Sequence, residues 1–306
     1  MYIYRLTLDV NGVVMYGKAA VLSTTGAHSI VPKLDLSPGR ELKDWQCAAG
    51  ADEGYESHSI KGRKALITGA SRVVGRAIAA ALVDTGAEVA INYRLGEEPV
   101  GDVERYIKDI GVGDDIQVYP ADLNDLVQAN GMKRQVSRHF GKIDILVNVG
   151  GIEFRTPGKG KNRVAWSIPE TVRLEGLRNC IRLFMEDLVA SEHGRIINIT
   201  PLARDNGARA PTTDGSSENG ILQMTVSLAR DLAAGNVTVN AIATGFMEPG
   251  KAAGMPPAIR KTILALVPKG RFGQPEELAW VIAFLSSVNS SYITGQVLRF
   301  AGGESP

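Results

Sequence analysis

The sequence predicts an α/β protein built around a doubly wound parallel sheet of about seven strands. From Ile60 onward, short apolar runs alternate with longer amphipathic stretches, as in sheets whose parallel strands are covered by helices on both faces. The stretch Lys64–Leu82 has the pattern of a buried strand, a glycine turn and a helix. The 306 residues, 44% of them hydrophobic, are enough for one large domain plus an appendage.

The expected elements follow from these patterns. We expect strands at Ala65–Thr68, Glu88–Tyr93, Ile116–Pro120, Ile143–Val149, Arg195–Thr200, Val237–Ile242 and Gln296–Phe300. We expect helices at Gly75–Asp84, Gly101–Ile110, Asn124–Phe140, Glu170–Ser191, Ser217–Ala234 and Pro275–Ser287. In such a fold, ligands bind at the carboxyl ends of the strands.

Residues 1–60 are interpreted as an N-terminal extension, and residues 61–306 as the main domain. Tyr2–Val10 and Val13–Val21 alternate apolar and polar side chains around an Asn-Gly pair, which predicts a β-hairpin. Leu36–Ser59, rich in Gly, charged and small residues, is interpreted as a linker. Because an isolated hairpin is marginally stable, we expect it to pack on the main domain or a neighbouring subunit. It would be an ordered decoration, a lid or a dimer arm.

Composition excludes several classes of protein. The 34 Lys+Arg and 33 Asp+Glu give a net charge of +1, so we expect neither a nucleic acid nor a membrane surface as partner. Two distant cysteines and four scattered histidines offer no disulfide framework and no metal-ligand spacing. Arg5 and Asp9 interrupt the N-terminal apolar stretch, unlike a signal peptide. We expect a cytoplasmic protein without a metal, acting on a small molecule.

The stretch KALITGASRVVGRAIAAAL has the arrangement of a phosphate-binding turn. Gly69 permits a tight turn after the strand, and Gly75 lets the helix pack closely on it. The first N–H groups of the helix would then face a bound phosphate. This glycine pattern indicates a phosphate-binding turn mainly because it lies between a strand and a helix.

The chain resembles the short-chain dehydrogenase/reductase family, and within it the acyl-carrier-protein reductase-like members, over Lys61–Gly303. The motifs that carry the resemblance are TGASRVVG (68–75), ADL (121–123), NVGG (148–151), GRIINIT (194–200), VNAIATGF (239–246), GRFGQPEELAWVIAFLSS (270–287) and SYITGQVLRFAGG (291–303). The resemblance implies a Rossmann-type fold and a nicotinamide cofactor. It also implies a homodimer or homotetramer, assembled through the helices at Glu170–Ser191 and Ser217–Ala234.

The resemblance assigns cofactor contacts to matching positions. Tyr93 stands where NAD-preferring members keep an acidic residue, and Arg94 and Arg72 suit a 2′-phosphate, unless both are solvated surface charges. We therefore expect NADP(H) rather than NAD. Val73 replaces a family Gly or Ala and could crowd the dinucleotide, so a cofactor-free protein is the alternative. The predicted cofactor residues are Thr68, Gly69, Ser71, Arg72, Val73, Val74, Gly75, Tyr93, Arg94, Asp122, Leu123, Asn148 and Gly150.

The catalytic positions depart from the family pattern. Where the family has Ser, Tyr, Lys and Asn, an alignment without gaps places Pro201, Asp214, Glu218 and Arg173. An Asp, with an ordinary pKa near 4 against about 10 for Tyr, cannot protonate an alkoxide when ionised. It also places negative charge where an oxyanion would form. A slip of one residue would instead bring Gly215 and Asn219 to the tyrosine and lysine positions.

One function that this departure leaves open is acid/base catalysis without redox chemistry. Asp214 and Glu218 are four residues apart, so they share a helix face, and neighbouring carboxyl groups titrate apart. They could act as general base and general acid in a cyclisation, isomerisation, epimerisation or dehydration. Arg173 could hold one carboxylate ionised or bind an anionic substrate.

Two other functions also remain open. The protein could be an NADPH-dependent ketoreductase with other donors, such as Thr200, a protonated Asp214, Glu153 or Arg155. Alternatively, the substitutions are decay, and the chain is a catalytically dead binding or scaffold protein. Asp214 would then cap the helix and Glu218 would complement the helix dipole.

Gly245–Pro268 corresponds to the substrate loop of the family and would move as a lid. Its apolar side chains suit a mostly apolar substrate, or else pack into the core or a subunit interface. They are Phe246, Met247, Met255, Ile259, Ile263 and Leu264. A divergent active site on a preserved scaffold suggests, by analogy, a role in specialised small-molecule biosynthesis.

Overall fold

The structure is a computed structural model of the chain. It describes residues 2–10, 13–21, 60–70, 73–94, 116–149, 170–202, 214–248 and 256–304. The chain divides into two compact units, Met1–Ser57 and His58–Pro306. The helix predicted at Gly101–Ile110 lies outside the described residues.

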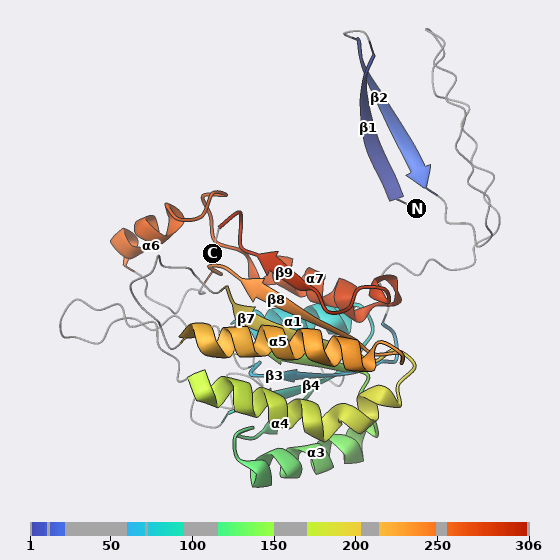
Figure 1. The fold of residues 1–306 in the computed structure, drawn as a ribbon, viewed down its shortest axis with the longest axis vertical. Helices are drawn as coiled ribbons and strands as arrows, with labels where there is room; N and C mark the ends of the chain where they lie inside the picture. Colours follow the sequence, from blue (N-terminus) through green and yellow to red (C-terminus); the bar gives the residue numbers. More distant parts are fainter. Residues whose placement is uncertain are drawn as a thin grey trace. The chain divides into compact units, whose positions relative to one another are not determined.

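The described part of the first unit is a two-stranded antiparallel sheet (Figure 1). Strand β1 spans Tyr2–Val10 and β2 spans Val13–Val21, as predicted. Val10 pairs with Val13, so two residues separate the strands, as in a two-residue hairpin loop. The Asn-Gly pair itself lies outside the described residues.

The second unit is organised by a seven-stranded sheet in which all neighbouring strands are parallel. The strands are β3 (Lys64–Thr68), β4 (Glu88–Tyr93), β5 (Ile116–Pro120), β6 (Ile145–Val149), β7 (Arg195–Pro201), β8 (Thr238–Thr244) and β9 (Val297–Phe300). Their order is β5-β4-β3-β6-β7-β8-β9, which confirms the predicted doubly wound fold. The winding reverses between β3 and β6, and ligands of such folds bind at this switch point.

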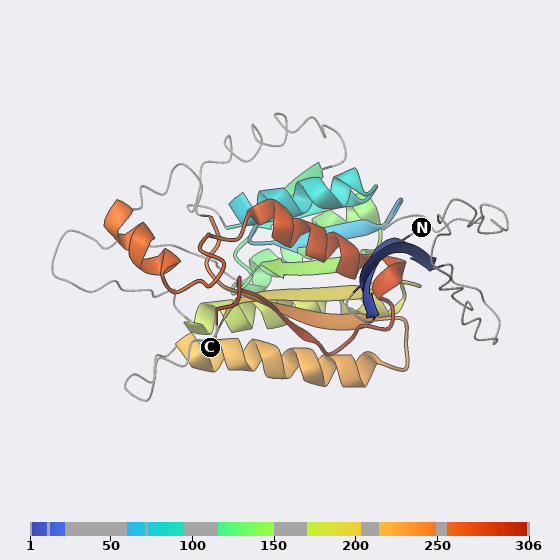
Figure 2. The same cartoon turned by 90° about the horizontal axis from the view of Figure 1, so that it is seen from above.

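Helices cover both faces of this sheet (Figures 1 and 2). Their bounds are α1 (Val73–Asp84), α3 (Leu126–Phe140), α4 (Glu170–Val189), α5 (Asp214–Leu232), α6 (Pro257–Leu264), α7 (Pro275–Ser286) and the short 3-10 helix η4 (Val288–Ser290). Helices α1 and α7 pack on one face and α3, α4 and α5 on the other, each over its own apolar core. Along β3, Leu66 and Ile67 point to opposite cores, since side chains alternate across a strand.

Helix α6 differs from the sequence prediction, which assigns Gly245–Pro268 to a loop. The helix begins at Pro257, a position where the fixed φ of proline is favourable. Ile263 of α6 packs with Phe246, Val267 and Phe272 in a small apolar cluster. Phe246, Met247 and Ile263 are buried, so for them the packing alternative is correct. Met255 and the side chain of Ile259 lie outside the described residues.

Among the described helices, none combines the length and apolarity that a membrane span requires. In the same part of the chain, no three His, Cys, Asp or Glu residues come together as a metal site. Cys180 is fully buried, and burial raises the pKa of its thiol to about 12. This thiol is therefore part of the core rather than a nucleophile.

Candidate nucleotide and active site

The turn between β3 and α1 lies at the switch point of the sheet. Gly69 has φ +62, and a Cβ there would lie 2.5 Å from the carbonyl oxygen of Val149. A Cβ on Gly75 would lie 2.3 Å from the Cα of Ala70. The N–H of Ala70 donates to the carbonyl oxygen of Asn92 over 3.1 Å. These close approaches hold the amino end of α1 at the carboxyl edge of the sheet.

Val73 is the first residue of α1, two residues earlier than the predicted start at Gly75. Its side chain is 41% exposed, whereas Val74 and Gly75 are buried. A β-branched side chain therefore projects from the helix turn whose N–H groups would hold a phosphate. In the described part of the turn, Val73 is therefore an exposed side chain at the amino end of α1. Ser71 and Arg72 lie outside the described residues.

Arg94 and Asp122 meet where β4 and β5 end. The Nε of Arg94 lies 3.3 Å from Oδ2 of Asp122. This pair joins the ends of two neighbouring strands that are distant in sequence. The other oxygen of Asp122 accepts hydrogen bonds from the backbone and side chain of Asn124. Since an exposed ion pair contributes about 0–1 kcal/mol, a phosphate could replace Asp122 as the partner of Arg94.

Two further predicted cofactor residues have limited exposure. Tyr93 is 1% exposed, so its side chain lies in the interior rather than beside a ribose. Leu123 is partly buried, and its carbonyl oxygen accepts a hydrogen bond of 3.0 Å from the side chain of Asn179. Gly150 lies outside the described residues.

A buried chain of polar side chains crosses the sheet below this edge. The hydroxyl of Thr68 donates to Asn148 Oδ1 over 3.3 Å, and Asn148 Nδ2 donates to Asn198 Oδ1 over 2.9 Å. Asn198 Nδ2 donates to Thr225 Oγ1 over 2.9 Å, and this hydroxyl donates to the carbonyl of Ile221. These hydrogen bonds link β3, β6, β7 and α5. Asn198 and Thr225 were not predicted, although an Asn inside the apolar run GRIINIT was a visible signal.

Thr200 lies at the carboxyl end of β7 and is fully buried. Its hydroxyl oxygen has no hydrogen-bond partner among the described residues. Most buried polar atoms in proteins are paired, so this hydroxyl is an exception at the carboxyl end of β7. Pro201, which stands at the family serine position, is the last residue of β7 and supplies neither a hydroxyl nor an N–H.

Helix α5 begins at Asp214, three residues earlier than predicted. Thr225 of this helix contacts Asn198 of β7, and α5 runs antiparallel to the strands that it connects. Glu218 lies seven residues before Thr225, about 10 Å at 1.5 Å per residue. Pro201 lies three residues after Asn198, about 10 Å at 3.3 Å per residue. The backbone at Glu218 is therefore level with the end of β7, and Asp214 lies one turn beyond it.

The first turns of α4 and α5 lie together. A Cβ on Gly220 of α5 would lie 2.9 Å from Cδ2 of Leu174 of α4. Arg173 precedes Leu174 in the first turn of α4, so its backbone lies near that of Glu218. The side chains of Arg173, Asp214 and Glu218 lie outside the described part of the structure, as do Glu153 and Arg155.

The comparisons with known proteins agree with this architecture. A family model described as "Enoyl-(Acyl carrier protein) reductase" matches residues 69–305. The 3-oxoacyl-[acyl-carrier-protein] reductase FabG of Thermotoga maritima is 32% identical over 245 residues, covering 80% of this chain and 98% of the relative. This chain belongs to the short-chain dehydrogenase/reductase family.

Two further similarities support the assignment to the short-chain dehydrogenase/reductase family. FabG of Staphylococcus aureus strain Mu50 is 33% identical over 241 residues, covering 79% of this chain and 97% of the relative. A crystal structure described as a short-chain alcohol dehydrogenase from Sinorhizobium meliloti 1021 has a TM-score of 0.68 and 30% identity. It covers 81% of this chain and 98% of that one. The unit Met1–Ser57 lies outside the matched family region.

Proposed function

We propose that this protein is an NADP(H)-binding enzyme that performs acid/base chemistry on a small organic substrate at the carboxyl edge of the sheet. The observation that carries the proposal is the start of α5 at Asp214, which puts two carboxylate residues at the beginning of the helix that faces the end of β7. Asp214 and Glu218 are four residues apart and therefore share one helix face.

Two neighbouring carboxyl groups can divide the work of acid/base catalysis. When one ionises, its negative charge favours the protonated form of the other. The carboxylate would take a proton from the substrate, and the carboxylic acid would return one at another atom. This exchange suits cyclisation, isomerisation or dehydration without net oxidation. Arg173 would hold the carboxylate ionised or bind an anionic substrate group.

The cofactor contacts of this proposal belong to the turn after β3. The positive φ of Gly69, the close packing of Gly75 and the amino end of α1 support phosphate binding there. Arg94 would exchange Asp122 for a 2′-phosphate. Bound NADPH supplies hydride chemistry in this family of folds.

A second candidate function is carbonyl reduction, and the buried hydroxyl of Thr200 favours it. Because this hydroxyl lacks a partner among the described residues, it could donate to a substrate carbonyl oxygen. A protonated Asp214 would then deliver the proton to the forming alkoxide. The named FabG relatives are 3-oxoacyl-[acyl-carrier-protein] reductases, which gives this candidate further support.

The first test is calorimetric titration of NADPH, NADP⁺ and NADH into the purified full-length protein. We expect the phosphorylated cofactors to bind more tightly than NADH. Val73→Gly should raise the affinity for NADPH about ten-fold, because it removes the side chain that narrows the turn. Val189→Gly is the matched control, since it makes the same change at an exposed site on α4. If no cofactor binds even to the Val73→Gly variant, the cofactor part of the proposal is wrong.

The second test separates the two candidate reactions. The protein is incubated with NADPH and a panel of small carbonyl and hydroxy compounds, while cofactor oxidation and product masses are measured. Products without cofactor oxidation support acid/base catalysis, and Asp214→Asn should then lower kcat by about 10²–10⁴-fold. Cofactor oxidation that Thr200→Val abolishes supports carbonyl reduction. Full turnover in Asp214→Asn contradicts both candidates.

The proposal includes self-association into a homodimer or homotetramer through α4 and α5. Sedimentation at several protein concentrations tests it, and a single monomeric species at all concentrations would contradict it.

A further inference from the structure

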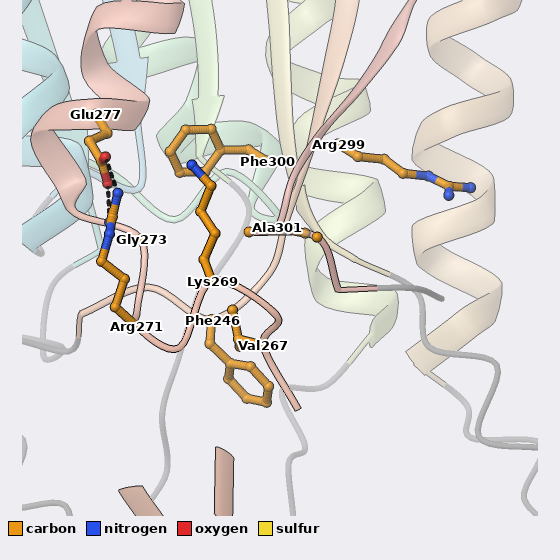
Figure 3. A pocket seen from close by; sticks show the side chains of 11 residues that line it. Phe246, Val267, Lys269, Arg271, Gly273, Glu277, Arg299, Phe300 and Ala301 are labelled. Carbon is orange, nitrogen blue, oxygen red and sulfur yellow. Dashed lines mark hydrogen bonds and ion pairs between the residues drawn. The ribbon is translucent and has the colours of Figure 1, made fainter. Parts of the chain in front are cut away.

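A cavity of about 270 Å³ lies at the carboxyl ends of β8 and β9 (Figure 3). Phe246, Val267 and Phe300 supply apolar surface, and Lys269 and Arg271 supply positive charge. Pockets for drug-sized ligands are about 300–1,000 Å³. This cavity therefore suits a smaller molecule with both an apolar and an anionic part.

The cationic groups at this cavity are not equally available. Arg271 donates to both carboxylate oxygens of Glu277 over 2.8 and 2.7 Å, and this bidentate pairing is the main cause that lowers the pKa of Glu277 to about 2. Arg299 points away from the other labelled side chains (Figure 3). Lys269 extends in the direction of Phe300 (Figure 3), and its ammonium makes no ion pair within the described ranges. The charge of Lys269 contributes to the lowered pKa of Glu277, but Lys269 forms no ion pair with that carboxylate, so of the cations at this cavity it is the one that a ligand could use.

Backbone donors add to this positive wall. Gly302 and Gly303 have φ of 63 and 87, in a turn closed by the bond from the N–H of Glu304 to the carbonyl of Ala301. The carbonyl of Gly302 accepts a bond from the N–H of Lys269 over 3.0 Å. Within the described residues, the N–H groups of Gly302 and Gly303 donate to no backbone carbonyl oxygen. Successive N–H groups in such turns form concavities that bind anions.

This cavity is separate from the nucleotide turn. The turn follows β3, and β9 lies four strand positions away in the sheet. At about 4.8 Å between neighbouring strands, β3 and β9 are roughly 19 Å apart within the sheet. A ligand in the cavity would therefore be an addition to the proposed cofactor rather than part of it.

We infer that this cavity binds a small amphiphilic anion. Its carboxylate or phosphate head would lie beside Lys269 and the N–H groups of Gly302 and Gly303. Its short apolar body would lie between Phe246, Val267 and Phe300.

Occupation of the cavity would also act on α6. Phe246 and Val267 belong to the small cluster that holds Ile263 of α6. A ligand that packs on these two side chains adds contacts to this cluster, which is separate from the two main cores. Binding should therefore stabilise α6 against local unfolding.

The test is calorimetric titration of the full-length protein, saturated with NADPH, with sodium hexanoate, inorganic phosphate and 1-hexanol. Hexanoate should bind most tightly, since it alone combines the head with an apolar body. Lys269→Met should weaken hexanoate binding about ten-fold or more, as expected for the loss of a charge-assisted hydrogen bond. Lys142→Met is the matched control at an exposed lysine on the opposite edge and should bind like the unmodified protein.

Hydrogen exchange on the unmodified protein keeps the inference testable if Lys269→Met fails to fold. Hexanoate should slow exchange in α6 and at residues 302–304, and Lys269→Arg should retain this footprint. An absence of hexanoate binding, a footprint elsewhere, or equal affinity in a folded Lys269→Met variant would overturn the inference. If hexanol binds as tightly as hexanoate, the cavity does not recognise an anionic head. If phosphate binds as tightly as hexanoate, the cavity does not recognise an apolar body.

Discussion

The two edges of the parallel sheet use their polar groups in opposite ways. At the amino edge, the Arg195 side chain is only 2% exposed. Its guanidinium donates to the carbonyl oxygens of Gly194 and Ser287 over 2.9 and 3.1 Å. Arg63 beside it donates to the carbonyl oxygen of Ser286 over 2.8 Å. Arg195 thus joins the end of α7 to the start of β7, and Arg63 joins it to the start of β3.

Buried polar atoms without a described partner occur at both edges, since Nε of Arg195 and Oγ of Ser286 at the amino edge also lack one; at the carboxyl edge such groups lie where ligands bind in this kind of fold. The Thr200 hydroxyl is buried and has no partner among the described residues, and the amino end of α1 is directed to the same edge. Groups that bind the chain's own backbone contribute to stability, whereas groups that await a ligand cost stability and serve function. The comparison therefore predicts that substitutions at the two edges will separate stability from activity.

The largest expected effect is at the amino edge. Arg195→Met should lower the free energy of unfolding by about 3 kcal/mol, because several buried carbonyl oxygens lose their donors at once. Urea denaturation followed by circular dichroism measures this loss. Arg182→Met, at an exposed arginine of α4, should change it by less than about 0.5 kcal/mol. If both substitutions lower the free energy of unfolding equally, the buried hydrogen bonds of Arg195 do not account for its contribution to stability.

A matched pair of threonines tests the comparison within one face of the sheet. Thr225→Val breaks the bonds to Asn198 and Ile221 and should cost about 1–2 kcal/mol of stability. Thr200→Val removes a hydroxyl without a described partner, so stability should stay equal or rise by up to about 1 kcal/mol. Thermal denaturation of both variants measures the difference. A larger loss in Thr200→Val would mean that its hydroxyl is part of the fold.

The smallest expected effect is a pH dependence at the amino edge. Burial, followed by the charges of Arg63 and Arg195, lowers the pKa of His193. Because the folded state disfavours the protonated imidazole, His193 should cost stability as pH falls below about 6.5, its ordinary pKa. His193→Gln should remove this cost. Between pH 7 and pH 5, the variant should therefore lose less stability than the unmodified protein. If the melting temperatures of the variant and the unmodified protein differ by the same amount at every pH in this range, His193 does not cause the pH dependence.

The elements that the sequence predicted best are those whose pattern is local. Glu88–Tyr93 and Ile116–Pro120 match β4 and β5 to the residue, because each is a short apolar run with clear ends. Helix α6 was not predicted, because a Pro-Pro pair is typical of loops; here Pro257 is the first residue of the helix, where proline is favourable.

The parts of the site that the sequence could not predict depend on contacts between distant residues. Asn198 and Thr225 are joined only because α5 packs on β7. Arg94 meets Asp122 only because β4 and β5 are neighbours. The glycine turn between β3 and α1 was predictable because its residues lie in one stretch, but the exposure of Val73 required the structure.

The packing around Gly69 and Gly75 changes what their presence means in evolution. Both positions are filled by the chain's own atoms, Val149 and Ala70, so any larger residue would be selected against even in a lineage that had abandoned the dinucleotide. These glycines are therefore required by the fold whether or not a ligand is bound. Val73 projects outward and is under no such restraint, which makes this position the one where natural selection for cofactor use can be read.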